Sequence, residues 1–148
     1  MTHESPVLIS ACLLGEACRF DGQGKENPGL LDRLKDRTLI PVCPEVEGGL
    51  SVPRPPAEIV GESVQRATGE DVTQAFVRGS ELCKSHGLNN GTSLAILKSR
   101  SPACGCGEIY DGTFSKTLIT GDGIFTKTLK SAGIECVSDE EFLENISR

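Results

Sequence analysis

Residues 6–10, with the sequence PVLIS, form a short and uninterrupted apolar run close to the start of the chain. A run of this length without polar alternation is typical of a strand that is covered on both faces, as in parallel sheets. Three later segments are also strand candidates: 38–42 (TLIPV), 94–97 (LAIL) and 134–137 (IECV). Pro41 has no backbone donor, which favours a place at the edge or the end of a sheet for the second segment. The sequence therefore predicts a sheet of about four strands.

Four further segments carry apolar residues at helical spacing, and each follows one of the strand candidates. The first helix begins near Pro28 and carries Leu30, Leu31 and Leu34. The second is capped by Thr68 or Asp71, ends near Gly87, and has on one face Val72, Phe76, Gly79, Leu82 and Cys83. The third runs from Phe125 to Ala132 and is stopped by Gly133, and the last runs from Ser138 to Ile146, with Ser138 and Glu141 matching a capping box. Strands that alternate with helices fold into a parallel sheet with right-handed crossovers and helices on both faces. We therefore predict a single α/β domain over residues 1–148, a Rossmann-like parallel sheet of about four strands flanked by helices.

Composition and charge narrow the classes of function. The chain of 148 residues carries a formal net charge of −6, which argues against nucleic-acid binding, because that affinity depends on lysine and arginine side chains that neutralise phosphates. No apolar run is long enough to span a membrane, and the N-terminus shows no secretion signal. The two histidines, His3 and His86, lie near a terminus and at a predicted helix end, so a histidine-based catalytic centre is not expected. We expect a cytoplasmic protein that acts on a small molecule, with no nucleic-acid or membrane partner.

Cysteines are the most informative residues of the chain. There are seven of them, and in a reducing cytoplasm they indicate metal binding or catalysis rather than disulfides. Cys12 lies two residues after the first predicted strand, Cys43 directly follows the second, and Cys104 lies in KSRSPACGCG after the third. Open α/β sheets bind their ligands outside the carboxyl ends of the strands. We therefore expect Cys12, Cys43 and Cys104 to converge in space, although 31 and 61 residues separate them along the chain.

The other cysteines have different interpretations. Cys83 on a helix face and Cys136 within a strand are expected to be small buried core residues, because free cysteine is among the most buried residue types. Cys18, in GEACRFDG, and Cys106, two residues after Cys104, lie in loops near the expected site. Either could serve as a metal ligand, and the residues alone leave this open.

Five blocks of sequence stand out along nearly the whole chain: ISACLLGEACRFDG (9–22), PVCPEVEGGLSVPRPPAEI (41–59), GEDVTQAF (69–76), AILKSRSPACG (95–105) and IYDGTF (109–114). Together they resemble the thiouracil desulfidase family, which was long filed as a domain of unknown function. The resemblance implies a cubane [4Fe-4S] cluster held by Cys12, Cys43 and Cys104, with the fourth iron open to the sulfur of a thiolated pyrimidine. It also implies roles for an acidic residue after the Cys-Pro pair, here Glu45, and for a serine before the third cysteine, here Ser101.

The activity that the resemblance implies is the conversion of thiouracil to uracil with release of hydrogen sulfide. Thiolates are soft ligands that suit iron–sulfur clusters or zinc, and an open iron acts as a Lewis acid. A thiocarbonyl sulfur is soft enough to bind that iron, which would open the attached ring carbon to attack by water. The exchange of C=S for C=O needs no net electron transfer, so no redox partner is required. 2-Thiouracil, 4-thiouracil and other thioamides are all candidate substrates.

Both non-cysteine site residues have a structural alternative. Glu45 could take a proton from water and later give it to the leaving groups, or it could cap a turn or pair with Arg54. Ser101 could hydrogen-bond the pyrimidine or orient the water, or it could be a turn residue before Pro102. The residue types alone do not decide between these roles.

Two other classes of protein also fit the cysteine pattern. One is a cluster-bearing sulfur carrier that delivers sulfide to a partner protein, and turnover of a free thiolated base would exclude it. The other is a non-catalytic zinc protein, which a brown iron–sulfur chromophore would exclude. The zinc ligands would then be Cys12, Cys18, Cys104 and Cys106.

Overall fold

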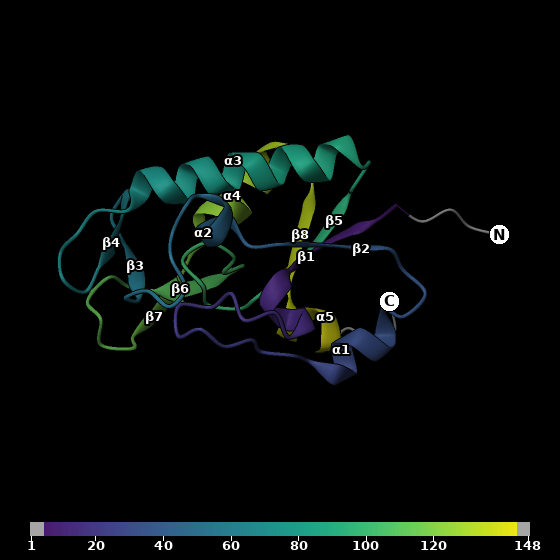
Figure 1. The fold of residues 1–148 in the computed structure, drawn as a ribbon, viewed down its shortest axis with the longest axis horizontal. Helices are drawn as coiled ribbons and strands as arrows, with labels where there is room; N and C mark the ends of the chain where they lie inside the picture. The colour runs from purple at the N-terminus through teal and green to yellow at the C-terminus, as the bar shows by residue number, and fades with distance from the viewer. Residues whose placement is uncertain (1–4, 145–148) are drawn as a thin grey trace.

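The computed structural model describes residues 5–144 and contains a central parallel sheet of four strands (Figure 1). The strands are β1 (Val7–Ser10), β2 (Leu39–Val42), β5 (Leu94–Leu97) and β8 (Glu135–Ser138), in the order β2-β1-β5-β8. All neighbouring pairs are parallel, and Val7 pairs with Leu39 on one side and with Leu94 on the other. The predicted α/β fold is confirmed, and β2, which contains Pro41, is an edge strand as its proline predicts.

Helices cover both faces of this sheet (Figure 1). α3 (Thr73–Asn89) and α4 (Ile124–Ser131) lie on one face, and α1 (Pro28–Arg33) and α5 (Asp139–Glu144) lie on the other. Each of them follows one strand of the sheet, which is the predicted alternation. The predicted end of the last helix, at Ile146, lies outside the described residues. Within residues 5–144, no helix is both long and apolar enough to cross a membrane.

The apolar strands of the sheet contribute side chains to two separate hydrophobic cores. Leu8 and Ala95 belong to the core beneath α3 and α4, whereas Val7, Ile9 and Ile96 belong to the core beneath α1 and α5. Successive side chains of a strand point to opposite faces, so a strand covered on both sides needs apolar residues at every position. All residues of β1 are buried accordingly.

α3 packs through a face of small and aromatic residues. Its buried positions are Phe76, Gly79, Ser80, Cys83 and Gly87. The prediction that Leu82 shares this face is wrong, because Leu82 is 50% exposed. Position 82 lies about 100° around the helix from position 83, which turns its side chain away from the core.

Short elements that the sequence pattern does not predict lie beyond the main sheet. They are the 3₁₀ helix η1 (Ala11–Leu14), the helical turn α2 (Pro44–Glu47), the hairpin of β3 (Ala57–Val60) with β4 (Ser63–Arg66), and the hairpin of β6 (Glu108–Tyr110) with β7 (Leu118–Thr120). Figure 1 shows both hairpins side by side at one end of the molecule, and β3 contacts β6. The proline-rich segment 41–58 thus contains a helical turn and the start of a hairpin.

Candidate functional site

A cavity of about 510 Å³ lies where the segments that follow β1, β2 and β5 meet. Cys12 reaches it from η1, Cys43 from the junction of β2 and α2, and Cys104 from the loop after β5. The cysteines that parallel topology is expected to bring together therefore line one cavity. Their role as ligands stays a prediction.

Local backbone structure fixes two of these cysteines. The carbonyl of Cys12 accepts the N–H groups of Gly15 and Lys25 at 3.0 and 2.8 Å, and Gly15 adopts the left-handed conformation (φ 95°) that lets the chain turn at this point. Cys43 precedes the first residue of α2, and its carbonyl accepts the N–H of Glu47 at 2.9 Å. Both side chains are thus carried by short helical turns rather than by free loops.

Cys18, which the sequence leaves open, also lines the cavity. Its thiol lies near enough to those of Cys12 and Cys43 for both to shift its pKa. The Cys43 thiol also donates to the carbonyl oxygen of Cys18, with Sγ 3.8 Å away. The signal that the sequence offers for this residue is its place in the glycine-containing loop that starts at Cys12.

Neighbouring thiols and burial raise the pKa values of the cysteines that line the cavity. The hydrogen bond with Cys12 raises the pKa of Cys18 to about 11 with the help of burial, and the contact with Cys43 opposes this shift. The hydrogen bond with Cys18 and burial raise the pKa of Cys43. Burial raises the pKa of Cys104, although a hydrogen bond with Ser10 lowers it. These thiols are protonated at neutral pH in the metal-free protein, so binding of a metal centre must release protons.

The cavity does not form a site for a single metal ion. Among residues 5–144, no group of three or more histidine, cysteine, aspartate or glutamate side chains is placed to hold one. Cys106, which the zinc interpretation requires, does not line the cavity, and its thiol donates to the carbonyl of Cys136 at 3.4 Å. The geometry therefore gives no support to the zinc protein.

Cys83 and Cys136 also lie outside the cavity. Cys83 is 2% exposed within the core beneath α3, and the half-buried Cys136 thiol donates to the carbonyl of Ile134 at 3.6 Å. Burial raises the pKa of both thiols to about 12. Cys83 therefore has the buried core position expected for it, whereas Cys136 is only half-buried against that core.

Glu45 lies in the first turn of α2 and lines the cavity. Its Oε1 accepts a hydrogen bond from Nε of Arg54 at 2.9 Å in a largely buried ion pair. Burial raises the pKa of Glu45, and Arg54 opposes this shift. The pairing with Arg54, one of the alternatives for Glu45, is therefore present, and the carboxylate is at the cavity as well.

Arg54, which the sequence suggests only as a possible partner of Glu45, joins several segments of the site. It is 7% exposed, its Nη1 donates to the carbonyl of Ser51 at 3.0 Å, and its Nη2 donates to the carbonyl of Cys18 at 2.8 Å. Its backbone N–H donates to the carbonyl of Phe20 at 2.7 Å. One buried guanidinium thus holds the Cys18 loop, the proline-rich segment and Glu45 together.

Ser101 shapes the loop that carries the third cysteine. Its Oγ accepts the N–H groups of Ala103 and Cys104, both at 3.0 Å, and its carbonyl accepts the N–H of Gly105 at 2.8 Å. The turn role left open for Ser101 is therefore present. Because the hydroxyl oxygen already accepts two hydrogen bonds and Ser101 lines the cavity, its hydrogen is available to a bound molecule as a donor.

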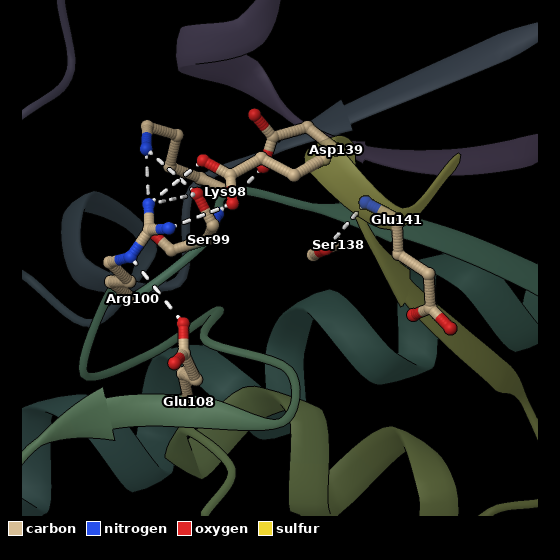
Figure 2. A network of polar contacts seen from close by, with 8 residues as sticks. Lys98, Ser99, Arg100, Glu108, Ser138, Asp139 and Glu141 are labelled. Atoms are coloured by element: carbon tan, nitrogen blue, oxygen red, sulfur yellow. Dashed lines mark hydrogen bonds and ion pairs between the residues drawn. The ribbon is translucent and has the colours of Figure 1, made fainter. Parts of the chain in front are cut away.

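A polar network holds the segment that follows β5 (Figure 2). Arg100 forms a bidentate ion pair with Glu140 of α5 at 2.9 and 2.8 Å, and its Nε lies 3.6 Å from Oε1 of Glu108. Asp139 Oδ1 accepts the N–H of Ser99 at 2.8 Å. Arg100 has a φ of 66°, a conformation that residues other than glycine rarely adopt, and these contacts hold it there. The network therefore fixes the path of the chain from β5 into the cavity.

Aromatic side chains form part of the cavity wall. Phe20, Tyr110 and Phe114 all line it. Glu58 Oε1 accepts the N–H groups of Gly112 and Phe114 at 3.0 and 3.2 Å, which fixes the turn between β6 and β7 at the cavity. Flat apolar surfaces of this kind suit a planar ring.

Comparison with known proteins identifies the group to which this site belongs. A model of the 2-thiouracil desulfurase family matches residues 7–141, a span that includes all the cavity-lining residues. The chain belongs to the 2-thiouracil desulfurase family. The resemblance seen in the five sequence blocks is thereby confirmed.

Two proteins are similar to this family member over almost the whole length of its chain. The uncharacterized protein YbbK of Bacillus subtilis (strain 168) is 37% identical over 145 residues, which cover 91% of this chain and 96% of YbbK. The solved structure of the [4Fe-4S]-dependent thiouracil desulfidase TudS is 42% identical, with a TM-score of 0.90 over 97% of both chains.

In this member of the 2-thiouracil desulfurase family, two glycines let α2 lie directly against α3. A methyl group on Gly79 of α3 would overlap the carbonyl oxygen of Pro44, and one on Gly48 would overlap the carbonyl oxygen of Ala75. The backbones of the two helices are therefore in contact. This contact positions the first turn of α2, which carries a cysteine and a glutamate to the cavity.

We expect Gly79→Ala to lower the free energy of unfolding by about 2 kcal/mol, because the backbone of α2 must move away from the new methyl group. The better helix propensity of alanine, worth about 1 kcal/mol, opposes this loss. Urea unfolding followed by circular dichroism measures the change. Gly29→Ala in α1 is the matched control, because its new methyl group meets no atom closer than Asn27 Oδ1 at 3.8 Å. Equal stability of the Gly79→Ala variant and the parent would contradict the close contact.

Proposed function

We propose that this protein is a [4Fe-4S]-dependent desulfidase that converts a thiouracil to uracil and releases hydrogen sulfide. The observation that carries the proposal is that Cys12, Cys43 and Cys104 line one cavity together with Glu45 and Ser101, although the chain brings them from different strand ends. The 42% identity to a solved protein described as a [4Fe-4S]-dependent thiouracil desulfidase supports it.

The residues present fit an iron–sulfur cluster better than a single ion. Thiolates are the protein ligands of such clusters, and each binds a different iron, so they surround a body with volume instead of a point. A cavity of about 510 Å³ lined by thiols, with no single-ion site in the described part of the chain, meets this requirement. Cys12, Cys43 and Cys104 would hold the cluster. When bound, it supplies a Lewis-acidic iron that can take the soft sulfur of a thiocarbonyl group.

Ser101 and the aromatic wall would orient the base. The Ser101 hydroxyl can donate to a carbonyl oxygen or a ring nitrogen of the pyrimidine, because its own oxygen is occupied by two backbone N–H groups. Phe20, Tyr110 and Phe114 offer apolar surface to the flat ring. Fixed orientation of the ring places its thiocarbonyl carbon where water can attack.

Glu45 would move the protons. The reaction consumes one water: its oxygen becomes the carbonyl oxygen of uracil, and its two protons leave with the sulfur as hydrogen sulfide. Glu45 takes a proton when water attacks and returns one to the departing sulfur or to the ring nitrogen. Arg54 holds Oε1 of this carboxylate in place at 2.9 Å. Atoms and charge balance without a reductant or an oxidant.

The direct test is turnover by protein that has been reconstituted anaerobically with iron and sulfide. With 2-thiouracil or 4-thiouracil as substrate, we expect loss of thiouracil absorbance and equimolar formation of uracil and sulfide, with no added protein or reductant. In water enriched in oxygen-18, the new carbonyl of uracil should carry the label, because water is the nucleophile. Chelator-treated protein is the control. If cluster-loaded protein converts no thiopyrimidine, the sulfur-carrier interpretation replaces this one, and unlabelled uracil would contradict the hydrolytic route.

A further inference from the structure

The turn between β6 and β7, residues 111–117, brings two side chains to the cavity wall in an unfavourable backbone conformation. Phe114 and Lys116 line the cavity, and their φ values are 57° and 62°. Residues other than glycine rarely adopt this left-handed conformation, and bulky side chains favour it least. Phe114 is also 36% exposed, so its ring gains little from packing within the protein. Strain that coincides with an exposed aromatic ring at a cavity favours a binding role for Phe114.

Glu58 of β3 anchors this turn. Its Oε1 accepts the N–H groups of Gly112 and Phe114 at 3.0 and 3.2 Å. Gly112 has a φ of 93°, and a methyl group at this position would lie 2.7 Å from the carbonyl oxygen of Ile59. The backbone of the turn therefore rests directly on β3. These contacts fix the backbone of Phe114 while its ring stays partly exposed at the cavity.

Polar side chains also brace the turn internally. Asp111 Oδ1 accepts the N–H and the hydroxyl of Thr113 at 3.0 and 2.6 Å, and the Thr113 hydroxyl lies 2.6 Å from that of Ser115. The Ser115 hydroxyl lies 2.7 Å from that of Thr117, whose carbonyl accepts the N–H of Asp111 at 2.9 Å. A braced surface loses less conformational entropy on binding, and it adapts less to a ligand of a different shape. The turn is therefore suited to select its ligand by shape.

We propose that Phe114 is a specificity-determining residue whose ring stacks on the substrate, and that Glu58 positions it. This inference rests on the proposed function and narrows its substrate class to flat, conjugated thioamide rings. An aromatic ring makes close contact with the whole face of a flat pyrimidine, whereas a saturated ring is puckered and meets it at fewer atoms. Uracil and 5,6-dihydrouracil carry the same carbonyl and N–H groups and differ in this property. Uracil should therefore bind more tightly.

The first measurement is the dissociation constant of radiolabelled uracil and of radiolabelled 5,6-dihydrouracil, by equilibrium dialysis against full-length protein reconstituted anaerobically with iron and sulfide. We expect the parent to bind uracil about 10-fold more tightly, an effect within the range of base stacking on an aromatic side chain. Phe114→Ala and Glu58→Ala should both lose this preference. Glu58→Gln should restore it, because the amide oxygen can still accept both N–H groups. Glu62→Ala is the matched control and should keep the preference, because it removes a carboxylate from an exposed position outside the cavity, in the connection between β3 and β4.

The second measurement is the KM for 2-thiouracil, which should rise about 10-fold in Phe114→Ala. The double variant with Glu58→Ala should show no further rise, because Glu58 acts through Phe114. Additive effects of the two substitutions would overturn the positioning role, and so would loss of the preference for uracil in Glu58→Gln, which would assign the effect to charge. An unchanged preference in Phe114→Ala would overturn stacking. Failure of the proposed function gives a different result: the parent prefers uracil and Phe114→Ala does not, but no thiopyrimidine is converted.

Discussion

Cys12→Ala, Cys43→Ala and Cys104→Ala should each yield protein that retains no stable cluster, whereas Cys83→Ala and Cys136→Ala should retain it. The proposed cluster depends on three protein thiolates, and removal of one leaves a second iron without a protein ligand. Alanine offers no donor atom. We therefore expect the iron content of the first three variants to fall close to zero after anaerobic reconstitution, together with their visible absorption.

Two features of the cavity set the controls for this experiment. Cys18 already lies at the cavity and could replace a missing ligand, so each of the three variants is also made together with Cys18→Ala. Cys83 is a stringent control, because its thiol contacts the backbone of Cys43 and yet does not line the cavity. Circular dichroism confirms that each variant folds. Equal iron content in the five single variants would end the assignment of Cys12, Cys43 and Cys104.

The central sheet could be predicted because its strands are short apolar runs that charged segments separate. The pairing of strands outside the central sheet was harder to predict. The β3–β4 hairpin does carry a local signal, since Gly61 lies in its two-residue connection with a φ of 64°, as tight hairpin turns require. β7 has no such signal, because all of its residues are exposed and no hydrophobic alternation marks it. Its position depends on pairing with β6, which only the folded chain defines.

The candidate site was predictable to the extent that sheet topology defines it. Cys12, Cys43 and Cys104 could be grouped because each follows a strand, and parallel strands end at one edge. Cys18 and Arg54 could not be grouped in this way. Their hydrogen bond joins loop residues 36 positions apart, and no periodicity specifies the path of such loops. For Glu45 and Ser101 the contacts that the structural alternatives require are present, and both residues also line the cavity.

Glu45→Gln should keep the cluster and lower kcat by about 10²- to 10⁴-fold, the usual contribution of general acid–base catalysis. Glutamine has nearly the same size, and its amide oxygen can still accept the hydrogen bond from Arg54 Nε. It cannot take a proton from water or return one to the leaving group. Turnover of 2-thiouracil is compared at equal iron content. Glu47→Gln is the matched control, because it removes the same charge from the same helical turn at an exposed position outside the cavity, and it should turn over at the parent rate.

The ion pair with Arg54 makes it possible to distinguish a structural role of Glu45 from a catalytic one in the Glu45→Gln variant. Arg54 is 7% exposed, and we expect it to keep its hydrogen bonds to the carbonyls of Ser51 and Cys18 when Glu45 loses its charge. A buried cation without its counter-ion still lowers the free energy of unfolding, so stability and turnover report on different roles of Glu45. Reduced stability with near-normal turnover would make Glu45 only the partner of Arg54. A colourless variant would show that the ion pair supports the cluster through the Cys18 loop. Retention of the cluster with loss of turnover is the result expected if the Glu45 carboxylate moves the protons, because only that role requires a group that can bind and release one.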